Sequence, residues 1–454
     1  MLEDTIIAIS TPLGFGALGI VRLSGKKSLA VAKKIFKPKK RGEIPPRRPI
    51  LGYLYNFEQK ESFEEAYLTF FPQPHTYTRE NIVEISCHGS PVILEEVVRL
   101  GLKAGARHAH PGEFTLRAYL KGRIDLLQAE AVNDLIQAAS LKQAKISFSQ
   151  VEGKLSNKIA SLRAKIIHLS AQIEARIEFP EENLRTSPKQ TGKALENLII
   201  FLEQLIRSYD FGKSLAEGIT LAITGRANVG KSTLFNSLLE RERAIVTPYP
   251  GTTRDYLKEK IKIKDSIFTL IDMAGIDRTS HPVDKEGIKK GKKLAKKSEG
   301  VFLLLDSSRK ENPEDFKLIG KFKDKKTLLL FNKMDLPQKI AKAKIKEKAK
   351  NIPFLDISAL KGTNLDKLKE MISKLFLPRQ EVGEDIILHL RQKLLLEDIL
   401  ASLIKVKHLL NEGHSEEIYA EEIRKIVPLI GQLTGEIRTD EIIDDIFRRF
   451  CVGK

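Results

Sequence analysis

The chain has 454 residues, of which 42% are hydrophobic and 30% charged, and its formal net charge is +18. This length suffices for about three domains with cores of their own. There is no run of eighteen apolar residues, and no basic stretch followed by an apolar one at the N-terminus, so we expect no membrane span, no secretory signal and a cytoplasmic protein. The two cysteines, Cys87 and Cys451, cannot build a disulfide framework.

The positive charge leaves two interpretations open. It favours binding to a polyanion, of which nucleic acid is the usual one. Much of it, however, lies in the lysine-rich runs 285–297 and 339–350, which are also typical of solvated helix faces.

Residues 1–118 are predicted to form an α+β domain with no nucleotide fingerprint of its own. A helix is expected at 91–101, where Pro91 opens an apolar period. The short apolar runs separated by Pro- and Gly-rich breaks predict strands at 5–9, 19–23, 50–57, 65–71 and 81–87.

Helical periodicity begins near Phe114 and holds to about Asp210, with breaks near 179–180 and 187–188. One predicted helix places Leu127, Ala131, Leu135 and Ala138 or Ala139 on one face. Residues 385–450 are again helical, with breaks near Gly413 and Gly431. Two helical stretches around an α/β region indicate one helical domain with an insertion, and two separate bundles are the alternative. The expected division is therefore 1–118, 119–214, 215–377 and 378–454.

The inserted region is predicted to be a doubly wound α/β domain, in which ligands bind at the carboxyl ends of the strands. Strands alternate with helices and are expected at 219–224, 267–272, 301–306, 327–332 and 354–358.

Gly225 to Ser232, GRANVGKS, follows the first of these strands and precedes a helix, which is the context that a phosphate-binding loop requires. Gly225 and Gly230 let successive N–H groups face a phosphate chain. Lys231 would meet the β/γ oxygens, and the Ser232 hydroxyl would bind Mg²⁺.

Three further motifs follow in order. DMAG (272–275) offers the Asp272 carboxylate to Mg²⁺ through water and the Gly275 N–H to a γ-phosphate. NKMD (332–335) ends in Asp335, whose carboxylate matches the N–H donors of guanine, which adenine lacks. SAL (358–360) completes the base pocket. The sequence therefore predicts a GTP site.

GTTRD (251–255) lies where a switch loop reaches the γ-phosphate, and Thr253 is the candidate metal-binding hydroxyl; an ordinary polar loop is the alternative. The position that carries a water-orienting Gln in some GTPases is Ile276. Asn228, with oxygens of 247–252, could bind a monovalent cation near the β/γ bridge. A turn-forming role for Asn228 is equally compatible with the sequence.

Other polar residues have modest default interpretations. Cys451, beside cationic residues at the chain end, could be a nucleophile or a cofactor contact, but an idle thiol is favoured on its sequence context alone. Cys87-His88, His108 and His110 lack a partner pair at zinc spacing, so core or turn roles are favoured. The default for Arg22, Glu84 and Arg123 is surface solvation.

The whole chain resembles the MnmE (TrmE) family of GTPases that act in uridine-5-carboxymethylaminomethyl modification of tRNA. The resemblance rests on TPLGFGALGIVRLSG, PGEFTLRAYLKGRIDLLQAEAV, the four central motifs and the terminal CVGK. It implies a homodimer formed through an N-terminal domain that binds 5-formyl- or 5,10-methylene-tetrahydrofolate. It also implies a potassium-dependent GTPase that works with the flavoprotein MnmG on carbon 5 of the wobble uridine of certain tRNAs.

Site roles follow by position. Folate contacts would be Arg22, Glu84, Arg123 and Lys454. Potassium ligands would be Asn228, Thr247, Tyr249 and Thr252, and Mg²⁺ ligands Ser232 and Thr253. The predicted GTP-binding residues are Asn228, Val229, Gly230, Lys231, Ser232, Thr233, Thr247, Pro248, Tyr249, Pro250, Gly251, Thr252, Thr253, Asp272, Met273, Ala274, Gly275, Asn332, Lys333, Asp335, Ser358, Ala359 and Leu360.

The chain departs from the family pattern at three positions. Ala227 replaces a proline of the phosphate loop, and Arg123 replaces a lysine of the folate site. The family's catalytic Glu aligns with Asp284, and Glu286 lies close by as a competitor. The resemblance also implies that Cys451 is the family's functionally important C-terminal cysteine, with its chemical role left open, so we expect catalytic roles for Asp284 and Cys451. A GTP-switched ribosome-assembly factor and a structural scaffold with an inactive GTPase domain are the alternatives.

Overall fold

The computed structural model describes residues 4–40, 42–179, 188–216, 218–242, 258–264, 266–272, 298–377, 386–437 and 440–453. The chain forms two compact units. The first comprises Met1–Asn133, Phe148–Thr191 and Lys405–Lys454, and the second comprises Asp134–Ser147 and Gly192–Ile404.

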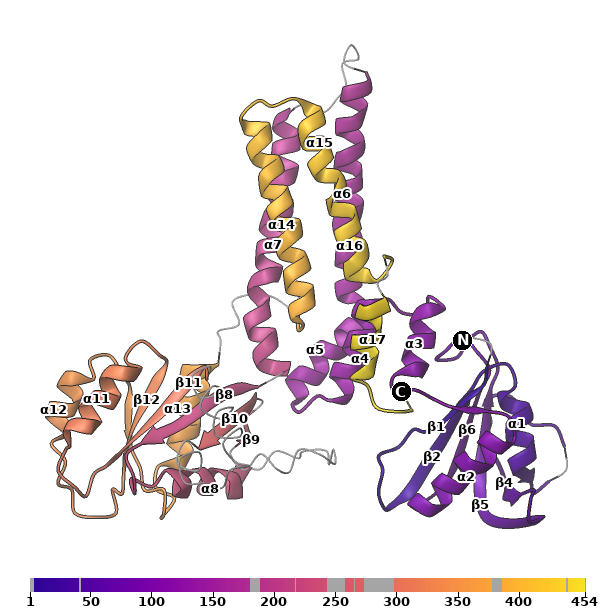
Figure 1. The fold of residues 1–454 in the computed structure, drawn as a ribbon, viewed down its shortest axis with the longest axis horizontal. Helices are drawn as coiled ribbons and strands as arrows, with labels where there is room; N and C mark the ends of the chain where they lie inside the picture. The colour runs from indigo at the N-terminus through magenta and orange to yellow at the C-terminus, as the bar shows by residue number, and fades with distance from the viewer. Residues whose placement is uncertain are drawn as a thin grey trace. The chain divides into compact units, whose positions relative to one another are not determined.

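A seven-stranded sheet with the order β3-β4-β5-β6-β2-β1-β7 forms the N-terminal part of the first unit (Figure 1). The chain neighbours β4, β5 and β6 pair antiparallel, whereas β1 and β7 pair parallel. The strands are β1 (Ile6–Ile9), β2 (Gly16–Ser24), β3 (Phe36–Pro38), β4 (Ile50–Asn56), β5 (Glu61–Phe71), β6 (Ile82–Gly89) and β7 (Arg107–His108).

The two faces of this sheet are covered differently. Helices α1 (Ser28–Ile35) and α2 (Pro91–Lys103) lie on one face and share its main core, to which Val21 and Leu23 of β2 belong. On the other face α3 (Glu113–Leu120) covers β1. Because side chains alternate along a strand and Val21 and Leu23 face the main core, Arg22 points to this second face.

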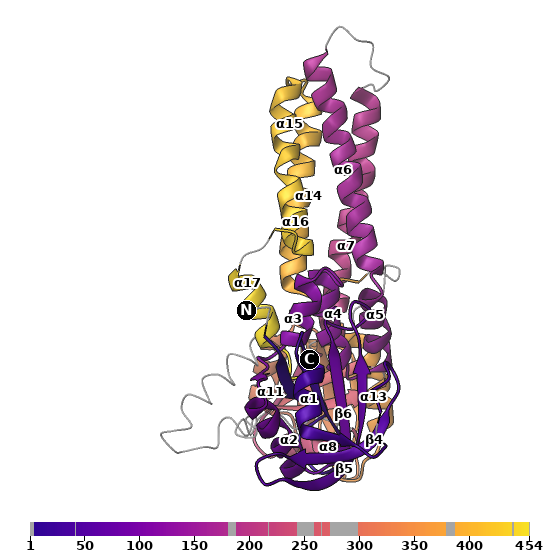
Figure 2. The same cartoon turned by 90° about the vertical axis from the view of Figure 1, so that its right-hand side faces the viewer.

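Long helices complete the first unit. The apolar residues of α6 (Lys154–Glu178) recur every three or four positions and are buried. Helices α15 (Glu416–Arg424) and α16 (Ile426–Thr434) pack along α6, and α17 (Asp440–Arg448) packs on α3 (Figures 1 and 2). The expected break near Gly431 is wrong, because α16 runs through this residue to Thr434 and is capped by Gly435.

Two shorter helices connect the units along the chain, α4 (Leu126–Ile136) and α5 (Leu141–Val151). Leu127 and Ala131 of α4 are buried as expected. The prediction that Ala138 or Ala139 continues this helix face is wrong, because α4 ends at Ile136.

The second unit contains a six-stranded sheet with the order β13-β12-β11-β8-β10-β9, parallel except for β9 at the edge. Every residue of β10, β11 and β12 is buried, as befits strands covered on both faces. The strands are β8 (Ile219–Gly225), β9 (Lys258–Ile263), β10 (Ser266–Asp272), β11 (Gly300–Asp306), β12 (Thr327–Asn332) and β13 (Phe354–Asp356).

Helices pack on both faces of this sheet. Leu234 of α8 (Lys231–Glu242) and Ile372 of α13 (Leu365–Phe376) belong to one core. Ile319 of α11 (Pro313–Phe322) and Ile345 of α12 (Lys342–Lys348) belong to the opposite one. Helices α7 (Pro188–Ala216) and α14 (Leu390–Asn411) flank the domain in the chain.

The predicted fold class is confirmed: an α+β domain, helical segments and an inserted doubly wound phosphate-loop domain. No helix in the described ranges is long and apolar enough to cross a membrane.

Candidate functional site

The phosphate loop lies at the carboxyl end of the central strand β8 and leads directly into α8. Lys231 is 8% exposed, and its Nζ donates to the carbonyls of Gly225 and Arg226 at 2.8 and 2.6 Å. The ammonium is thus held under the loop, beside the N–H groups at the start of α8. This is the arrangement that a chain of phosphates requires.

Glycine is required at two positions of this loop. Gly225 and Gly230 have φ values of +147° and +99°. A Cβ at Gly225 would meet the Leu304 carbonyl, and one at Gly230 would meet the Asn332 amide. The loop therefore closes against β11 and β12 only with glycine at both positions.

The two predicted magnesium-binding side chains of the described chain lie together. Ser232 Oγ donates to Asp272 Oδ2 at 2.9 Å. Asp272 ends β10, the neighbour of β8, and is 6% exposed. A hydroxyl and a carboxylate beside a phosphate loop are the hard oxygen ligands that Mg²⁺ prefers.

The base motifs meet next to this loop. Asn332 Nδ2 donates to the Val229 carbonyl at 2.8 Å, and Asn332 Oδ1 accepts the Ala359 N–H at 2.9 Å. One buried amide thereby joins β12, the phosphate loop and the segment after β13. A hydrogen bond from Ser358 lowers the pKa of Asp335 below its ordinary value, so its carboxylate stays ionised for the N–H donors of guanine.

Lys333 stabilises the rim of this site. Its Nζ donates to the Asn228 carbonyl at 2.9 Å and to Asp306 at 2.6 Å. Burial alone would raise the pKa of Asp306, but Lys333 and Ser308 outweigh burial and leave it lowered. Asn228 has a φ of +61° and is exposed. The positive φ is compatible with the turn-forming role of asparagine, and the exposure is compatible with an amide that contacts a ligand.

Several predicted residues lie outside the described ranges: Thr247, Pro248, Tyr249, Pro250, Gly251, Thr252, Thr253, Met273, Ala274, Gly275, Ile276, Asp284, Glu286 and Lys454. The roles given to them stay predictions.

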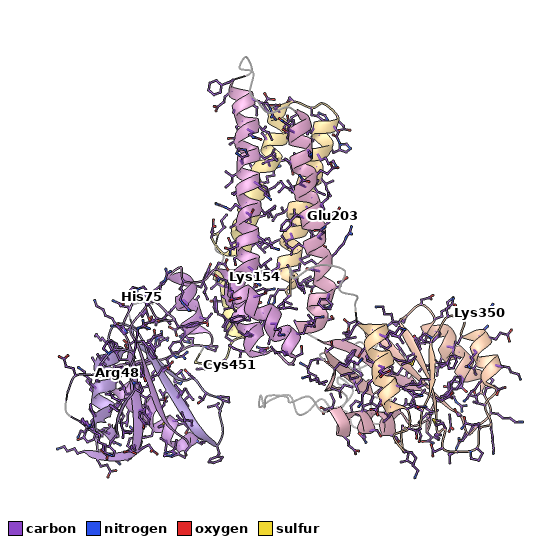
Figure 3. The ribbon with its side chains drawn as sticks, turned by 180° about the vertical axis from the view of Figure 1, so that it is seen from behind. Arg48, His75, Lys154, Glu203, Lys350 and Cys451 are labelled. Atoms are coloured by element: carbon purple, nitrogen blue, oxygen red, sulfur yellow. The ribbon has the colours of Figure 1, made fainter. Side chains whose placement is uncertain are left out.

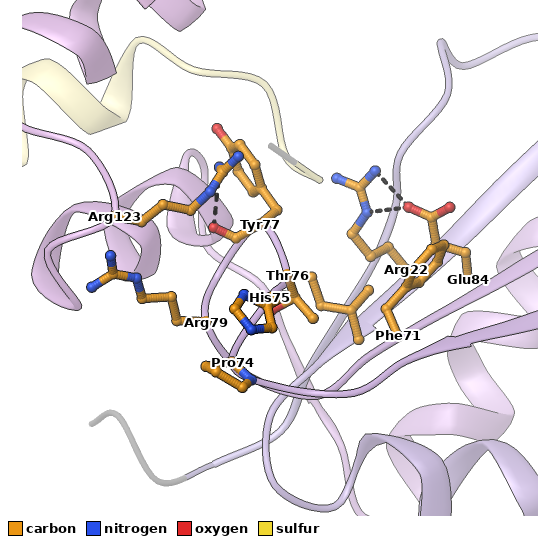
Figure 4. Close-up of a pocket in the computed structure, with 10 residues that line it drawn as sticks. Arg22, Phe71, Pro74, His75, Thr76, Tyr77, Arg79, Glu84 and Arg123 are labelled. Carbon is orange, nitrogen blue, oxygen red and sulfur yellow. Dashed lines mark hydrogen bonds and ion pairs between the residues drawn. The ribbon is translucent and has the colours of Figure 1, made fainter. Parts of the chain in front are cut away.

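A pocket of about 460 Å³ opens on the second face of the N-terminal sheet (Figure 4). Arg22, Glu84 and Arg123 all line it, although they come from β2, β6 and the segment after α3. Sequence reasoning alone did not select the remaining lining residues, Phe71, Pro74, His75, Thr76, Tyr77, Arg79 and Ile82.

Simple surface solvation is the wrong description of Arg22 and Glu84. Antiparallel pairing of β2 with β6 sets them opposite each other, and Glu84 Oε1 accepts from Arg22 Nη2 at 2.7 Å and from Nε at 2.9 Å. The two side chains are only 18% and 25% exposed. Both bonds go to one oxygen, which leaves Glu84 Oε2 as an acceptor with no hydrogen bond in the described part of the chain.

A buried ionic network holds the wall of this pocket. Arg117 of α3 is fully buried and contacts three carboxylates, those of Asp4, Glu80 and Glu113. Glu80 also accepts from Ser24 at 2.8 Å. The network fixes the 74–80 segment against α3. Its members are scattered over more than a hundred positions, so sequence spacing could not reveal it.

The C-terminal segment returns to the same domain. The Cys451 carbonyl accepts the Gly112 N–H at 3.3 Å, and Ser10 Oγ donates to the Gly453 carbonyl at 3.1 Å. The segment from α17 thus reaches the β1–β2 connection, with Cys451 just before its end (Figure 3). Cys451 is partly exposed.

The core role expected of Cys87 is confirmed, but the core or turn role is wrong for His88 and His108, which are exposed residues of β6 and β7. Cys87 is a core residue, and burial raises its thiol pKa to about 11. His88 lies 2.9 Å from Glu64, and His108 contacts the Ala109 carbonyl. Among the described residues no group of three or more His, Cys, Asp or Glu side chains could hold a metal ion.

Comparison with known proteins gives consistent results over the whole chain. A family model described as GTP-binding protein TrmE N-terminus matches residues 5–123, and one described as MnmE helical domain matches residues 126–451. The tRNA modification GTPase MnmE of Aquifex aeolicus is 40% identical over 100% of both chains. The protein of that name from Desulforamulus reducens is 38% identical, again over 100% of both chains. The solved G domain of the T. maritima FeoB iron transporter is 26% identical, covering 35% of this chain and 98% of its own, with a TM-score of 0.26.

Proposed function

The chain belongs to the MnmE family of tRNA modification GTPases, and on that premise we propose a reaction for it. It hydrolyses GTP in a potassium-dependent way. Together with the flavoprotein MnmG, it installs a carboxymethylaminomethyl-type group at carbon 5 of the wobble uridine of certain tRNAs, with a tetrahydrofolate derivative as one-carbon donor. The observation that carries the GTPase assignment is the Asn332 amide, which joins the guanine motif to the phosphate loop.

Different described residues bind the phosphates, the base and the metal ion of GTP. The loop N–H groups and Lys231 bind the β- and γ-phosphates. Asp335 selects guanine, and Asn332 and Ser358 hold the base pocket in register with the loop. Ser232 and Asp272 would hold Mg²⁺, which would supply positive charge beside the phosphates when bound.

Potassium would occupy the position that an arginine finger has in other GTPases. The exposed amide of Asn228 at the loop fits a weakly hydrated cation, with Thr247, Tyr249 and Thr252 as its further proposed ligands. Because Ile276 stands where some GTPases have the water-orienting Gln, another group must orient the attacking water, and we assign this role to the carboxylate of Asp284 rather than that of Glu286.

The pocket on the N-terminal sheet fits a folate. Its volume of about 460 Å³ lies within the range of small-molecule sites. The second Glu84 oxygen can accept from the N–H donors of a pterin ring, because Arg22 donates only to the first one and fixes the carboxylate in place. Arg123 lines the opposite side, and we propose Lys454 as a further contact. When bound, the folate supplies the one-carbon unit.

Cys451 lies on the segment that reaches this same domain, which supports a role in the chemistry near the pocket. The net charge of +18 suits a protein that acts on tRNA in the cytoplasm.

A homodimer through the N-terminal domain is supported by an apolar cluster at the β1–β2 connection. Leu13, Phe15 and Leu18 are 74%, 93% and 63% exposed. An exposed cluster of this kind is typical of an interaction surface.

The deciding experiment has two parts. Purified protein should hydrolyse GTP faster in potassium than in sodium. In addition, tRNA from cells that lack this chain should lose the wobble modification, and the intact gene should restore it. Normal tRNA modification combined with a defect in ribosomal subunits would instead support an assembly factor.

A further inference from the structure

Two arginines of the N-terminal pocket have no carboxylate to pair with. Arg79 and Arg123 lie on one side of the pocket, across Thr76 and His75 from the Arg22–Glu84 pair (Figure 4). Neither guanidinium lies within ion-pair distance of a carboxylate in the described residues. Four other arginines of this domain do: Arg22 pairs with Glu84, Arg99 with Glu58 and Glu96, and Arg107 and Arg117 with Asp4 and Glu113. Arg47 and Arg48, like Arg79 and Arg123, have no carboxylate partner in the described part of the chain.

Backbone carbonyls hold both guanidinium groups in place. Arg79 Nη1 donates to the Lys121 carbonyl at 2.7 Å, and Arg123 Nη1 donates to the Tyr77 carbonyl at 3.3 Å. Each arginine is therefore anchored to the segment that carries the other one. The Arg123 guanidinium also lies 4.7 Å from the centre of the Tyr77 ring, which restricts it further.

The anchors leave most donors unused. A guanidinium has five N–H donors, and one bond to a carbonyl is recorded for each of these two. The described lining contains three arginines and one glutamate, so two positive charges remain uncompensated there. Both arginines are exposed and line the same pocket, so each can donate to one carboxylate of a ligand that carries two.

We propose that Arg79 and Arg123 bind the two carboxylates of the glutamyl tail of the folate, and that this pair makes the pocket specific for ligands that carry the tail. The inference rests on the proposed folate site, and it adds Arg79, to which the family resemblance gives no role. With the heterocycle at Glu84, the tail points to the other side of the pocket.

The test compares 5-formyltetrahydrofolate with 5-formyltetrahydropteroate, which lacks the glutamyl tail, by calorimetry on the full-length protein. The tetrahydropteroate still ends in a benzoate carboxylate, so it carries one carboxylate where the tailed ligand carries two. The wild type should bind the tailed ligand about tenfold more tightly, since one charge-assisted pair is lost with the tail. In the double variant Arg79→Gln/Arg123→Gln this ratio should approach one. Raising the salt concentration should lower it in the wild type.

Arg48→Gln is the matched control, because Arg48 is an exposed arginine of the same domain outside the pocket lining (Figure 3). It should keep the full discrimination. Thermal unfolding of the three proteins checks that the double variant folds.

The possible outcomes distinguish the assignment of the glutamyl tail from the proposed folate site. Equal binding of both ligands by the wild type overturns the tail assignment and leaves the folate site standing. Failure to bind either ligand overturns both. If the double variant keeps its discrimination but loses affinity for tRNA, the arginines contact RNA phosphates and the inference is wrong.

Discussion

Ser232 Oγ and Asp272 Oδ2 lie 2.9 Å apart, although 40 positions separate them in the chain. Parallel pairing of β8 with β10 brings about this approach, because it sets the two strands side by side with their carboxyl ends at one edge of the sheet. Both side chains can therefore bind one cation beside the phosphate loop, and their contribution can be tested through the magnesium dependence of turnover.

Asp272→Asn should raise the Mg²⁺ concentration needed for half-maximal GTP turnover by about ten- to a hundredfold, since the amide keeps the shape but loses the charge. The measurement is turnover against Mg²⁺ concentration. Asp366→Asn serves as the control, because Asp366 has an 85% exposed side chain on α13. An unchanged magnesium requirement in Asp272→Asn would remove this carboxylate from the metal site.

Asp335→Asn should change the base that the protein binds. An amide presents a donor as well as an acceptor, so it loses one of the two guanine N–H partners and suits xanthine, whose ring offers one N–H and one carbonyl. We expect GTP affinity to fall by about a hundredfold or more, as for a buried polar group that loses its partner. Competition between GTP and XTP for a fluorescent nucleotide measures the exchange, and Asp335→Ala should lose GTP without gaining XTP.

The central domain was the most predictable part of the chain, because its buried strands are continuous apolar runs and each motif directly follows one of them. The edge strand β9 was not predicted. Exposed Lys260 and Lys262 alternate there with buried Ile261 and Ile263, so no apolar run marks it. Exposed lysines at a sheet edge are a common protection against pairing with another chain.

The errors elsewhere come from packing and pairing that residue types alone do not specify. Gly431 was taken as a break, but it lies inside α16, where a Cβ would meet Ile437. Gly435 ends the helix instead, with a φ of +83°. Arg22 and Glu84 meet only through the β2–β6 register, which the sequence alone does not specify.

Gly230→Ala should weaken GTP binding at least about tenfold and destabilise the domain by about 1–3 kcal/mol, since the residue has a φ of +99°. The added Cβ would also meet the Asn332 amide that joins the base motif to the loop. Nucleotide titration and denaturant unfolding measure the two effects. Gly320→Ala is the matched control: nothing lies within 4 Å of its Cβ, and as a residue of α11 it should keep or slightly increase stability.

Glu113→Gln should loosen α3 at neutral pH and lose this effect in acid. Burial raises the pKa of Glu113, but Arg107, the His110 N–H and Arg117 outweigh burial and leave it below the ordinary 4.5. A lowered folded-state pKa stabilises above the unfolded value, and this stabilisation is lost as pH falls through the folded value. Breaking the buried pair should cost about 3–5 kcal/mol at pH 7, and this difference from wild type should shrink below pH 4.5.

Hydrogen exchange across α3 in the full-length protein measures this opening free energy. Glu96→Gln is the control, because its partner Arg99 is a surface residue with a 40% exposed side chain and such pairs contribute at most about 1 kcal/mol. A difference between Glu113→Gln and wild type that persists unchanged in acid would show that the carboxylate charge is not what holds α3.

Asn228 is the residue at which two physical roles must be separated. Its φ of +61° favours asparagine or glycine in the loop, and its exposed amide is the proposed potassium ligand. Asn228→Ala disturbs both, because alanine removes the amide and is strained in the left-handed region. Asn228→Gly removes the amide alone, so this variant separates the two roles.

If the amide binds potassium, both variants should lose the stimulation of turnover by potassium over sodium, while Asn228→Gly keeps nearly wild-type affinity for GTP. If only the backbone angle matters, Asn228→Gly should keep the stimulation and Asn228→Ala should lose affinity as well as turnover. Turnover in matched potassium and sodium buffers, with nucleotide affinity measured in each, distinguishes these results. Full stimulation in Asn228→Gly would assign the cation to the remaining loop oxygens, because this variant keeps the backbone of the loop but offers no side-chain oxygen at 228.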